Sequence, residues 1–243
     1  MIIYGPVPSR RLGRSLGINN IPPKVCTYSC VYCQLGCTMR MPVSRREFYK
    51  PDVILKETGE KIEKVRESGE SIDYLTFVPD GEPTLDVNLG QEIERMKSYG
   101  IKIAVITNAS LIWRADVRED LRKADWVSLK VDSTREDIWR KINRPHKTLQ
   151  LATILNGMLE FAKVYGGELV TETMLVKDVN DDEDHVRAVA DFLVQLKPAR
   201  AYLAIPTRPP AEKWVQCPPE EKIVRGYQIF HEKINYVEYL IGY

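Results

Sequence analysis

Three cysteines near the N-terminus have the spacing of ligands to one inorganic centre. Cys26, Cys30 and Cys33 form a C-x3-C-x2-C pattern. Thiolates this close in sequence converge on one centre because a short loop can wrap around it, and iron–sulfur clusters take cysteine thiolates as ligands. Three protein ligands on a four-iron cube leave one iron open, where an external molecule can bind.

Other cysteine chemistries compete with the open cluster. Structural zinc takes four ligands, commonly as two separated C-x2-C pairs, and the short span from Cys26 to Cys37 is cramped for that arrangement. An electron carrier of the ferredoxin kind also uses four cysteines, often with a following proline, but Thr38 follows Cys37. A disulfide is disfavoured in a reducing compartment. The spacing favours an open cluster and leaves a zinc site or a closed cluster as alternatives.

The composition is that of a folded chain without a membrane segment. The 243 residues are 44% apolar and 28% charged, and no apolar run approaches the roughly 20 residues that a membrane span needs. The first residues lack the charged-then-apolar pattern of a signal peptide. We therefore expect a cytoplasmic protein, no membrane partner, and one domain over residues 1–243 with a cluster loop at about residues 24–40.

Positive charge is concentrated in the first fifty residues. The net charge of the chain is +1, but this segment has eight basic residues against Glu47 alone. The basic residues are Arg10, Arg11, Arg14, Lys24, Arg40, Arg45, Arg46 and Lys50. Such an excess beside a cysteine cluster suits an anionic cofactor, an anionic substrate or nucleic acid, and the alternative is a solvated basic face.

Short β-rich runs alternate with amphipathic helical stretches along the chain. This order predicts an α/β fold with parallel strands, and the length fits a partial (βα)6 TIM-like barrel better than a closed barrel of about 250 residues. Ligands are expected at the carboxyl ends of the strands. The predicted strands are residues 15–19, 74–78, 102–107, 126–131, 168–175 and 201–205.

Two of the helical stretches are clear from their periodicity. Apolar residues from 151 to 162 follow the spacing of one buried helix face, and a second helix begins after Asn180. Asn180 and Asp181 are therefore predicted to cap that helix rather than bind a ligand. His185 and His231 lie in helical patterns, so both are predicted to face solvent.

The fourth predicted strand carries a polar face. Period-2 alternation places Ser128, Lys130 and Asp132 on one side of the strand and apolar residues on the other. A purely structural barrel interior would prefer aliphatic residues on both sides. The polar side therefore predicts a ligand cavity inside the barrel, although Lys130 and Asp132 as a mutual surface pair are the alternative.

The motifs together resemble the radical SAM superfamily. The three cysteines have an aromatic residue, Tyr32, before the last of them, as in that superfamily. Residues 80–85 read Asp-Gly-Glu-Pro-Thr-Leu and resemble its GEP motif, and residues 107–110 are similar to its T-N-G turn. Residues 5–13, 143–146, 179–181 and 208–210 resemble a branch of Fe–S oxidoreductases related to the archaeal wyosine-forming tRNA enzyme. Cys37 departs from the pattern, and we interpret it as a spare thiol.

The resemblance implies an activity and its cofactors. A 4Fe–4S cluster on Cys26, Cys30 and Cys33 would cleave S-adenosylmethionine (SAM) reductively and generate a 5′-deoxyadenosyl radical, which abstracts hydrogen from a substrate. The electron would come from a one-electron reductant such as a ferredoxin or flavodoxin. The protein would supply orientation and exclusion of water.

The resemblance also implies which residues contact SAM. Gly81, Glu82 and Pro83 would form an edge whose carbonyls accept from the SAM amino group, with an ordinary turn as the alternative. Lys130 would meet the carboxylate, and Asp132 or Asn108 would bind the ribose. The residues expected to flank adenine are Tyr32 and Ile205.

Three residues are candidates for substrate contact. Arg144 and His146 lie in a loop after the fourth strand, near the expected active rim, and shaping of that loop around Pro145 is the alternative. Glu172 is a carboxylate in the fifth strand, where a buried charge needs a partner.

Several functions remain open at this stage. Within the enzyme class, the branch resemblance and the basic segment suggest tRNA base modification, while chain length also suits activation of a partner enzyme; a small-molecule rearrangement, methylation or carbon insertion is a third option. Outside that class, Cys37 could be the fourth cluster ligand of a non-enzymatic electron carrier, or the cysteines could hold a structural zinc ion in a binding protein. The repeated βα units and the polar fourth strand favour an enzyme.

Overall fold

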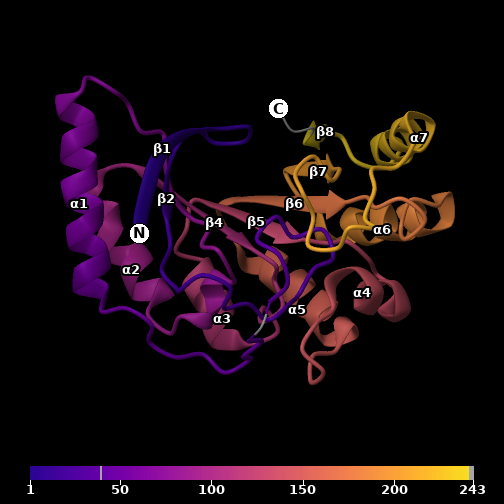
Figure 1. Ribbon diagram of the computed structural model, residues 1–243, viewed down its shortest axis with the longest axis horizontal. Helices are drawn as coiled ribbons and strands as arrows, with labels where there is room; N and C mark the ends of the chain where they lie inside the picture. The colour runs from indigo at the N-terminus through magenta and orange to yellow at the C-terminus, as the bar shows by residue number, and fades with distance from the viewer. Residues whose placement is uncertain (39, 241–243) are drawn as a thin grey trace.

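The computed structural model describes residues 1–38 and 40–240. Eight strands within this part of the chain form one curved sheet, in the order β1 to β8 (Figure 1). Strands β2 to β8 run parallel, and β1 is antiparallel to β2. The sheet is a half-barrel within an α/β fold. The strands are β1 Ile3–Ser9, β2 Gly13–Ile18, β3 Tyr74–Phe77, β4 Lys102–Thr107, β5 Trp126–Lys130, β6 Glu168–Met174, β7 Arg200–Ala204 and β8 Val237–Leu240.

The six strands expected from the sequence correspond to β2 to β7, so the partial barrel is confirmed. The sheet differs from the prediction in having two more strands, β1 and β8. Strand β1 contains Pro6 and Pro8, which cannot donate a ladder hydrogen bond, and proline weakens a sequence pattern for a strand. Strand β8 has four residues. Both lie at the ends of the sheet, where such strands are tolerated.

Helices cover the convex face of the sheet. They form an arc from α1 to α7 in Figure 1. They are α1 Pro51–Glu67, α2 Leu89–Met96, α3 Ala115–Leu121, α4 Glu136–Asn143, α5 Leu151–Val164, α6 Glu183–Leu196 and α7 Glu220–His231, with 3-10 turns at Pro83–Leu85 and Lys97–Tyr99. Within the described residues, no helix combines the length and the apolar character needed to cross a membrane.

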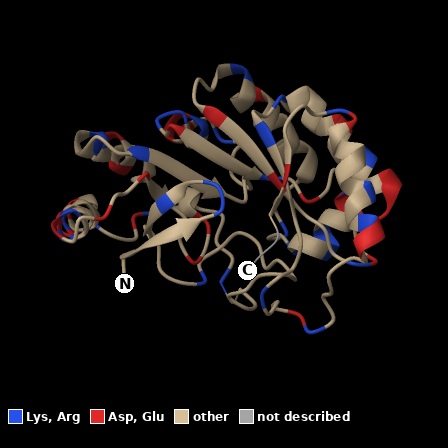
Figure 2. Cartoon of the chain, turned by 90° about the horizontal axis from the view of Figure 1, so that it is seen from above, with Lys and Arg blue, Asp and Glu red and all other residues tan. Residues whose placement is uncertain are grey.

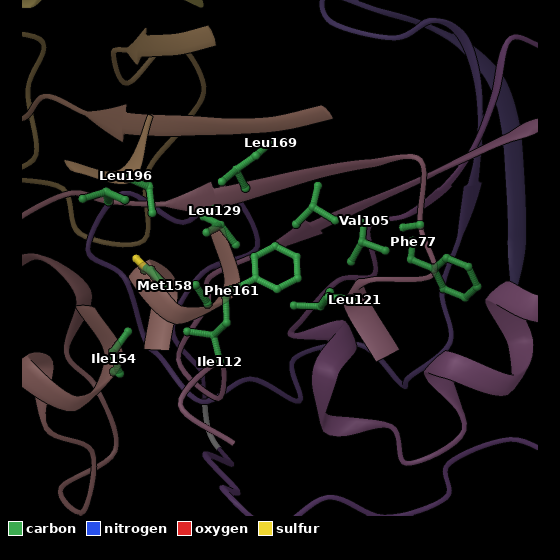
Figure 3. Close-up of a cluster of buried hydrophobic side chains, with 14 of the residues drawn as sticks. Phe77, Val105, Ile112, Leu121, Leu129, Ile154, Met158, Phe161, Leu169 and Leu196 are labelled. Carbon is green, nitrogen blue, oxygen red and sulfur yellow. The ribbon is translucent and has the colours of Figure 1, made fainter. Parts of the chain in front are cut away.

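The main core lies between this convex face and the helices. Alternate strand residues such as Val105 and Leu129 are buried there, and Figure 3 shows them around Phe161 of α5. Phe161 has no exposed surface. Burial of each such side chain contributes roughly 1.5–3 kcal/mol. This packing fixes the strands, and therefore fixes which side chains point to the opposite, concave face.

The concave face has a smaller apolar floor. Trp126, Val170 and Tyr202 are buried in it together with Leu12. Leu12 comes from the turn between β1 and β2, so this hairpin turn reaches across the concave face (Figure 1 shows it extending toward β8). The apolar floor of the half-barrel is therefore formed partly by the turn between β1 and β2, which lies outside the six predicted βα units.

Two predictions around α6 are wrong. His185 is fully buried, and its Nε2 lies 3.1 Å from the carbonyl oxygen of Asp132. The helix is capped by Asp182, whose side chain accepts from the amide of His185, and Asn180 instead donates to the carbonyls of Asp132 and Met174. The first turn of α6 packs against the end of β5, and helical periodicity alone does not reveal that contact. His231 is exposed, as predicted.

Candidate cofactor site

The cysteine loop is attached on one side to the turn after β3. The amide of Lys24 donates to the carbonyl of Asp80 over 2.6 Å, and the amide of Glu82 donates to the carbonyl of Val25 over 3.1 Å. Backbone bonds of this kind fix the loop independently of side-chain rotamers. The GEP turn therefore supports the loop directly beside Cys26.

On its other side, the loop is attached to the end of α4. The amide of Val31 donates to Ile142 over 2.9 Å, and the amide of His146 donates to the carbonyl of Thr27 over 2.9 Å. A β-bridge joins Tyr28 to Pro145. The segment Asn143–His146 thus positions the loop between its first two cysteines, which supports the loop-shaping interpretation of this motif.

The three cysteines of the motif are partly buried and are not in disulfides, whereas Cys37 is exposed. Side-chain amides approach two of the sulfurs: Asn108 Nδ2 lies 3.4 Å from Cys26 Sγ, and Asn143 Nδ2 lies 3.5 Å from Cys30 Sγ. Burial raises the pKa of the Cys26 thiol above its usual range and the pKa of Cys30 to about 12. Without metal these thiols are protonated, and a metal would bind their thiolates.

The donor set fits an iron–sulfur cluster. Three thiols on one loop are the ligand type that such clusters take. Across residues 1–38 and 40–240, no three His, Cys, Asp or Glu side chains lie close enough to share a single metal ion. A cube that takes one thiolate on each of three irons does not need its ligands to converge on one atom.

Gly81 lies against the backbone of the cysteine loop. A Cβ atom built on Gly81 would be 2.1 Å from the carbonyl oxygen of Val25 and 2.9 Å from Ile21 Cδ1. The colliding atom is backbone, so it cannot move aside as a flexible side chain would. The glycine is therefore required for the close approach of the GEP turn to the residue before Cys26.

Substitution of Gly81 by alanine should damage the site. The Val25 carbonyl would have to shift, and with it Cys26, so we expect the unfolding free energy to fall by about 1–3 kcal/mol. Iron content after reconstitution should fall severalfold. Gly166→Ala is the control, because no atom lies within 4 Å of its added Cβ. Equal iron content in the two variants would contradict this role of Gly81.

Glu82 joins the GEP turn to the turn after β4. It is 1% exposed, and it accepts from Thr84, from the Thr107 hydroxyl at 2.6 Å and from the Asn108 amide at 2.8 Å. Burial raises its pKa despite these bonds. Its side chain therefore has a structural task. Pro83 begins the 3-10 turn, and its carbonyl accepts from Asn20.

Lys130 and Glu172, predicted for SAM and for substrate, contact each other on the concave face. Glu172 forms ion pairs with both Lys130 and Arg11, and each of the three side chains is less than 20% exposed. Burial alone would raise the pKa of Glu172, but the two cations outweigh it and lower that pKa to about 2. Lys130 stays a cation, because Glu172 raises its pKa against the effect of burial.

Asp132 has internal partners for both carboxylate oxygens. One oxygen accepts from the Tyr32 hydroxyl and, over 2.7 Å, from Asn143; the other accepts from the Met174 amide over 2.8 Å. Burial raises the pKa of Asp132. The network links Tyr32 of the cysteine loop to β5 and α4. Lys130 Nζ also lies 5.2 Å from the centre of the Tyr32 ring.

The remaining predicted residues lie around the rim. Arg144 forms an ion pair with Glu212, and His146 Nδ1 lies 2.8 Å from the Thr148 hydroxyl. Their partners are thus in the loops that border the cysteine loop, and substrate contact by either stays a prediction. Ile205 directly follows β7 and is half-buried.

Arg11 and Asn143 are site residues that the sequence analysis did not identify as such. Arg11 belongs to the basic segment and to the motif of residues 5–13, and neither pattern predicts that it reaches Glu172 from a distant hairpin. Asn143 begins the motif of residues 143–146, which resembles the family. Its place in the chain after the polar strand β5 could have indicated that it is a site residue. Asn143 contacts both Asp132 and Cys30.

Comparisons with known proteins agree with this geometry. The family model described as "Radical SAM superfamily" matches residues 20–191. A UPF0026 protein from Methanocaldococcus jannaschii is 54% identical over 96% of this chain and 72% of its own. A radical SAM methyltransferase from Sphaerobacter thermophilus has a similar fold, with TM-score 0.70 and 17% identity over 94% of this chain and 67% of that one. TYW1 with a lysine–pyruvate adduct bound has TM-score 0.68 and 16% identity, over 91% and 74%.

Proposed function

This chain belongs to the radical SAM superfamily, whose enzymes bind a 4Fe–4S cluster and SAM, and from that premise we propose its reaction. The cluster is held by Cys26, Cys30 and Cys33. SAM binds beside it and is cleaved reductively to methionine and a 5′-deoxyadenosyl radical, which abstracts hydrogen from the substrate.

One observation carries the proposal. The loop with the three thiols is held between the GEP turn and the end of α4, and its Tyr32 reaches the polar network of β5 on the concave face. Cys37 is exposed, and its sulfur lies 3.9 Å from a Glu212 oxygen. This supports a three-thiolate site rather than the four-thiolate site of an electron carrier.

The chain's own groups suit the parts of SAM. Within the described residues, the carbonyls of Glu82 and Pro83 already accept backbone amides, and the Gly81 carbonyl has no such partner. We therefore assign the SAM amino group to Gly81. Lys130 is a cation that can face the SAM carboxylate while it retains Glu172.

Ribose and adenine are assigned to groups near the strand ends. Asn108 is assigned to the ribose beside its internal bonds to Thr27 and Ser110. Asp132 is assigned to the orientation of Tyr32, whose hydroxyl it accepts together with donors from Asn143 and Met174. Tyr32 and Ile205 are assigned to the two sides of adenine.

When bound, the cluster supplies one electron to the SAM sulfonium, and this electron breaks the C5′–S bond homolytically. The protein orients the two cofactors and excludes water from the concave face. Enzymes of this superfamily need a reductant, and we propose a ferredoxin or flavodoxin in that role.

A tRNA substrate is less well supported. Part of the basic N-terminal segment is neutralised by ion pairs: Arg11 pairs with Glu172 and Arg45 with Asp116 and Asp120 in partly buried sites, and Arg14 pairs with Glu70 at the surface. Figure 2 shows acidic and basic residues interspersed along helices and loops. Nucleic-acid binding needs a continuous basic surface. The likeness to TYW1, at 16% identity, shows the fold alone.

The test is an anaerobic assay on the full chain reconstituted with iron and sulfide. After reduction with dithionite, added SAM should change the electron paramagnetic resonance signal of the cluster and yield 5′-deoxyadenosine and methionine. If SAM binds without cleavage, turnover requires the substrate. If SAM leaves the signal of a fully loaded cluster unchanged, the proposed reaction is wrong.

A further inference from the structure

The concave face carries more positive than negative charge. Lys130 and Arg11 flank one carboxylate, Glu172, and Lys130 also lies within electrostatic range of Asp132. Two further cations, Arg10 and Arg208, belong to the same cluster. Arg10 and Arg208 add two positive charges that no ion pair compensates within the part of the chain that the structure describes.

Arg10 and Arg11 reach this face because of the hairpin between β1 and β2. Leu12 is 3% exposed and anchors the turn in the apolar floor, and the Arg11 guanidinium lies 5.8 Å from the ring centres of both Trp126 and Tyr202. The turn is therefore a fixed part of the concave face rather than a solvated tip. Arg10, the preceding residue, lies at its edge and is exposed, as is Arg208.

Arg10 and Arg208 have no carboxylate partner within residues 1–38 and 40–240. Arg208 donates to the side-chain oxygen of Gln34 over 2.5 Å, and Arg10 has neither an ion pair nor a side-chain hydrogen bond among those residues. Partial burial lowers the pKa of Arg10; the charges of Arg11 and Arg208 also lower it, while Glu172 raises it, so Arg10 lies near all three of these groups. Unpaired like charges at one place indicate an anionic ligand.

The position of this cluster relates it to the cofactor site. Gln34 directly follows Cys33, so its bond to Arg208 places that guanidinium beside the cysteine loop. On the inner side, Arg11 shares Glu172 with Lys130. An anion bound by Arg10 and Arg208 would lie at the rim next to the space assigned to SAM.

We propose that Arg10 and Arg208 bind a phosphate monoester group on the substrate, with Arg11 behind them. This rests on the proposed function and names the substrate class: a phosphorylated small molecule. Guanidinium groups match phosphate oxygens in bidentate geometry. A phosphate monoester carries about −1.5 to −2 charges at pH 7, which matches the two charges of Arg10 and Arg208, whereas the phosphodiester of a nucleic-acid backbone carries one.

The test is calorimetric titration of the cluster-loaded full chain with inorganic phosphate at constant ionic strength. Arg10→Gln and Arg208→Gln should each weaken phosphate binding by about tenfold, as expected for loss of one charge-assisted hydrogen bond. Arg14→Gln is the matched control, because Arg14 lies on the same hairpin and pairs with Glu70 on the surface. It should bind phosphate like the unmodified chain.

Three results would overturn the proposal. The first is no phosphate binding by the unmodified chain, and the second is equal weakening by Arg14→Gln, which would indicate general surface charge. The third is equal binding of dimethyl phosphate, which would favour a nucleic-acid backbone. Phosphate binding does not depend on SAM cleavage, so a chain that binds phosphate but yields no 5′-deoxyadenosine, and whose cluster signal does not respond to SAM, would contradict only the proposed reaction.

Discussion

Alanine at Cys26, Cys30 or Cys33 is expected to abolish 5′-deoxyadenosine formation. Each variant lacks one of three ligands, so the loss should exceed the roughly 10- to 100-fold typical of residues that only support a metal ligand. Cys37→Ala should retain the activity, because Cys37 is exposed, whereas the three cysteines of the motif are partly buried. Iron content and 5′-deoxyadenosine would be measured in parallel on anaerobically reconstituted protein.

The Cys37 variant is the internal control of this series. It removes a thiol group from the same loop, a few residues further along the chain. Any effect that comes from the loss of a thiol in general should therefore be the same in all four variants. If Cys37→Ala loses its cluster together with the others, the site has four thiolates. The electron-carrier interpretation would then replace the open cluster.

Glu172→Gln is expected to destabilise the fold by about 3 kcal/mol, within the range for breaking a buried ion pair from one side. The amide leaves Arg11 and Lys130 facing each other on the concave face without the carboxylate that now lies between them. Denaturant unfolding would measure the change. Glu183→Gln is the control: it removes a carboxylate that pairs with Arg187 and Arg225 at the surface, and it should leave the unfolding free energy nearly unchanged.

The pH dependence of stability gives a second measurement on the same variant. Because the folded state lowers the pKa of Glu172 from 4.5 to about 2, its stabilisation is fully present above about pH 4.5. It is lost as the pH falls from about 4.5 to 2. The Glu172→Gln chain should lack this part of the acid sensitivity, and an unchanged stability difference between pH 6 and pH 3 would contradict the ion-pair assignment.

Local sequence patterns were sufficient for much of the fold and for the cofactor loop. The cysteine spacing needs only a short loop, and the alternation in β5 correctly placed Val127 and Leu129 in the convex core. It also predicted a polar concave side with Lys130. Such features depend on neighbours within a few residues, which is why they can be read from the chain.

Contacts between segments that are distant in the sequence could not be predicted from local patterns. Arg11 and Glu172 are separated by 161 residues, and nothing near either residue specifies the other. His185 looked like a solvated helical residue until the fold placed the first turn of α6 on the end of β5. The role of Asp132 changed for the same reason, since Asn143 and Met174 reach it only in the folded state.

The prolines of β1 have a consequence for how this protein behaves at high concentration. A half-barrel, unlike a closed barrel, leaves strand edges, and an unpaired edge is a template for aggregation with a second chain. Pro6 and Pro8 lie in the edge strand β1 and offer no amide hydrogen to an incoming strand. The prolines that weaken the strand pattern of β1 therefore also make this edge of the open sheet a poor template for another copy of the chain.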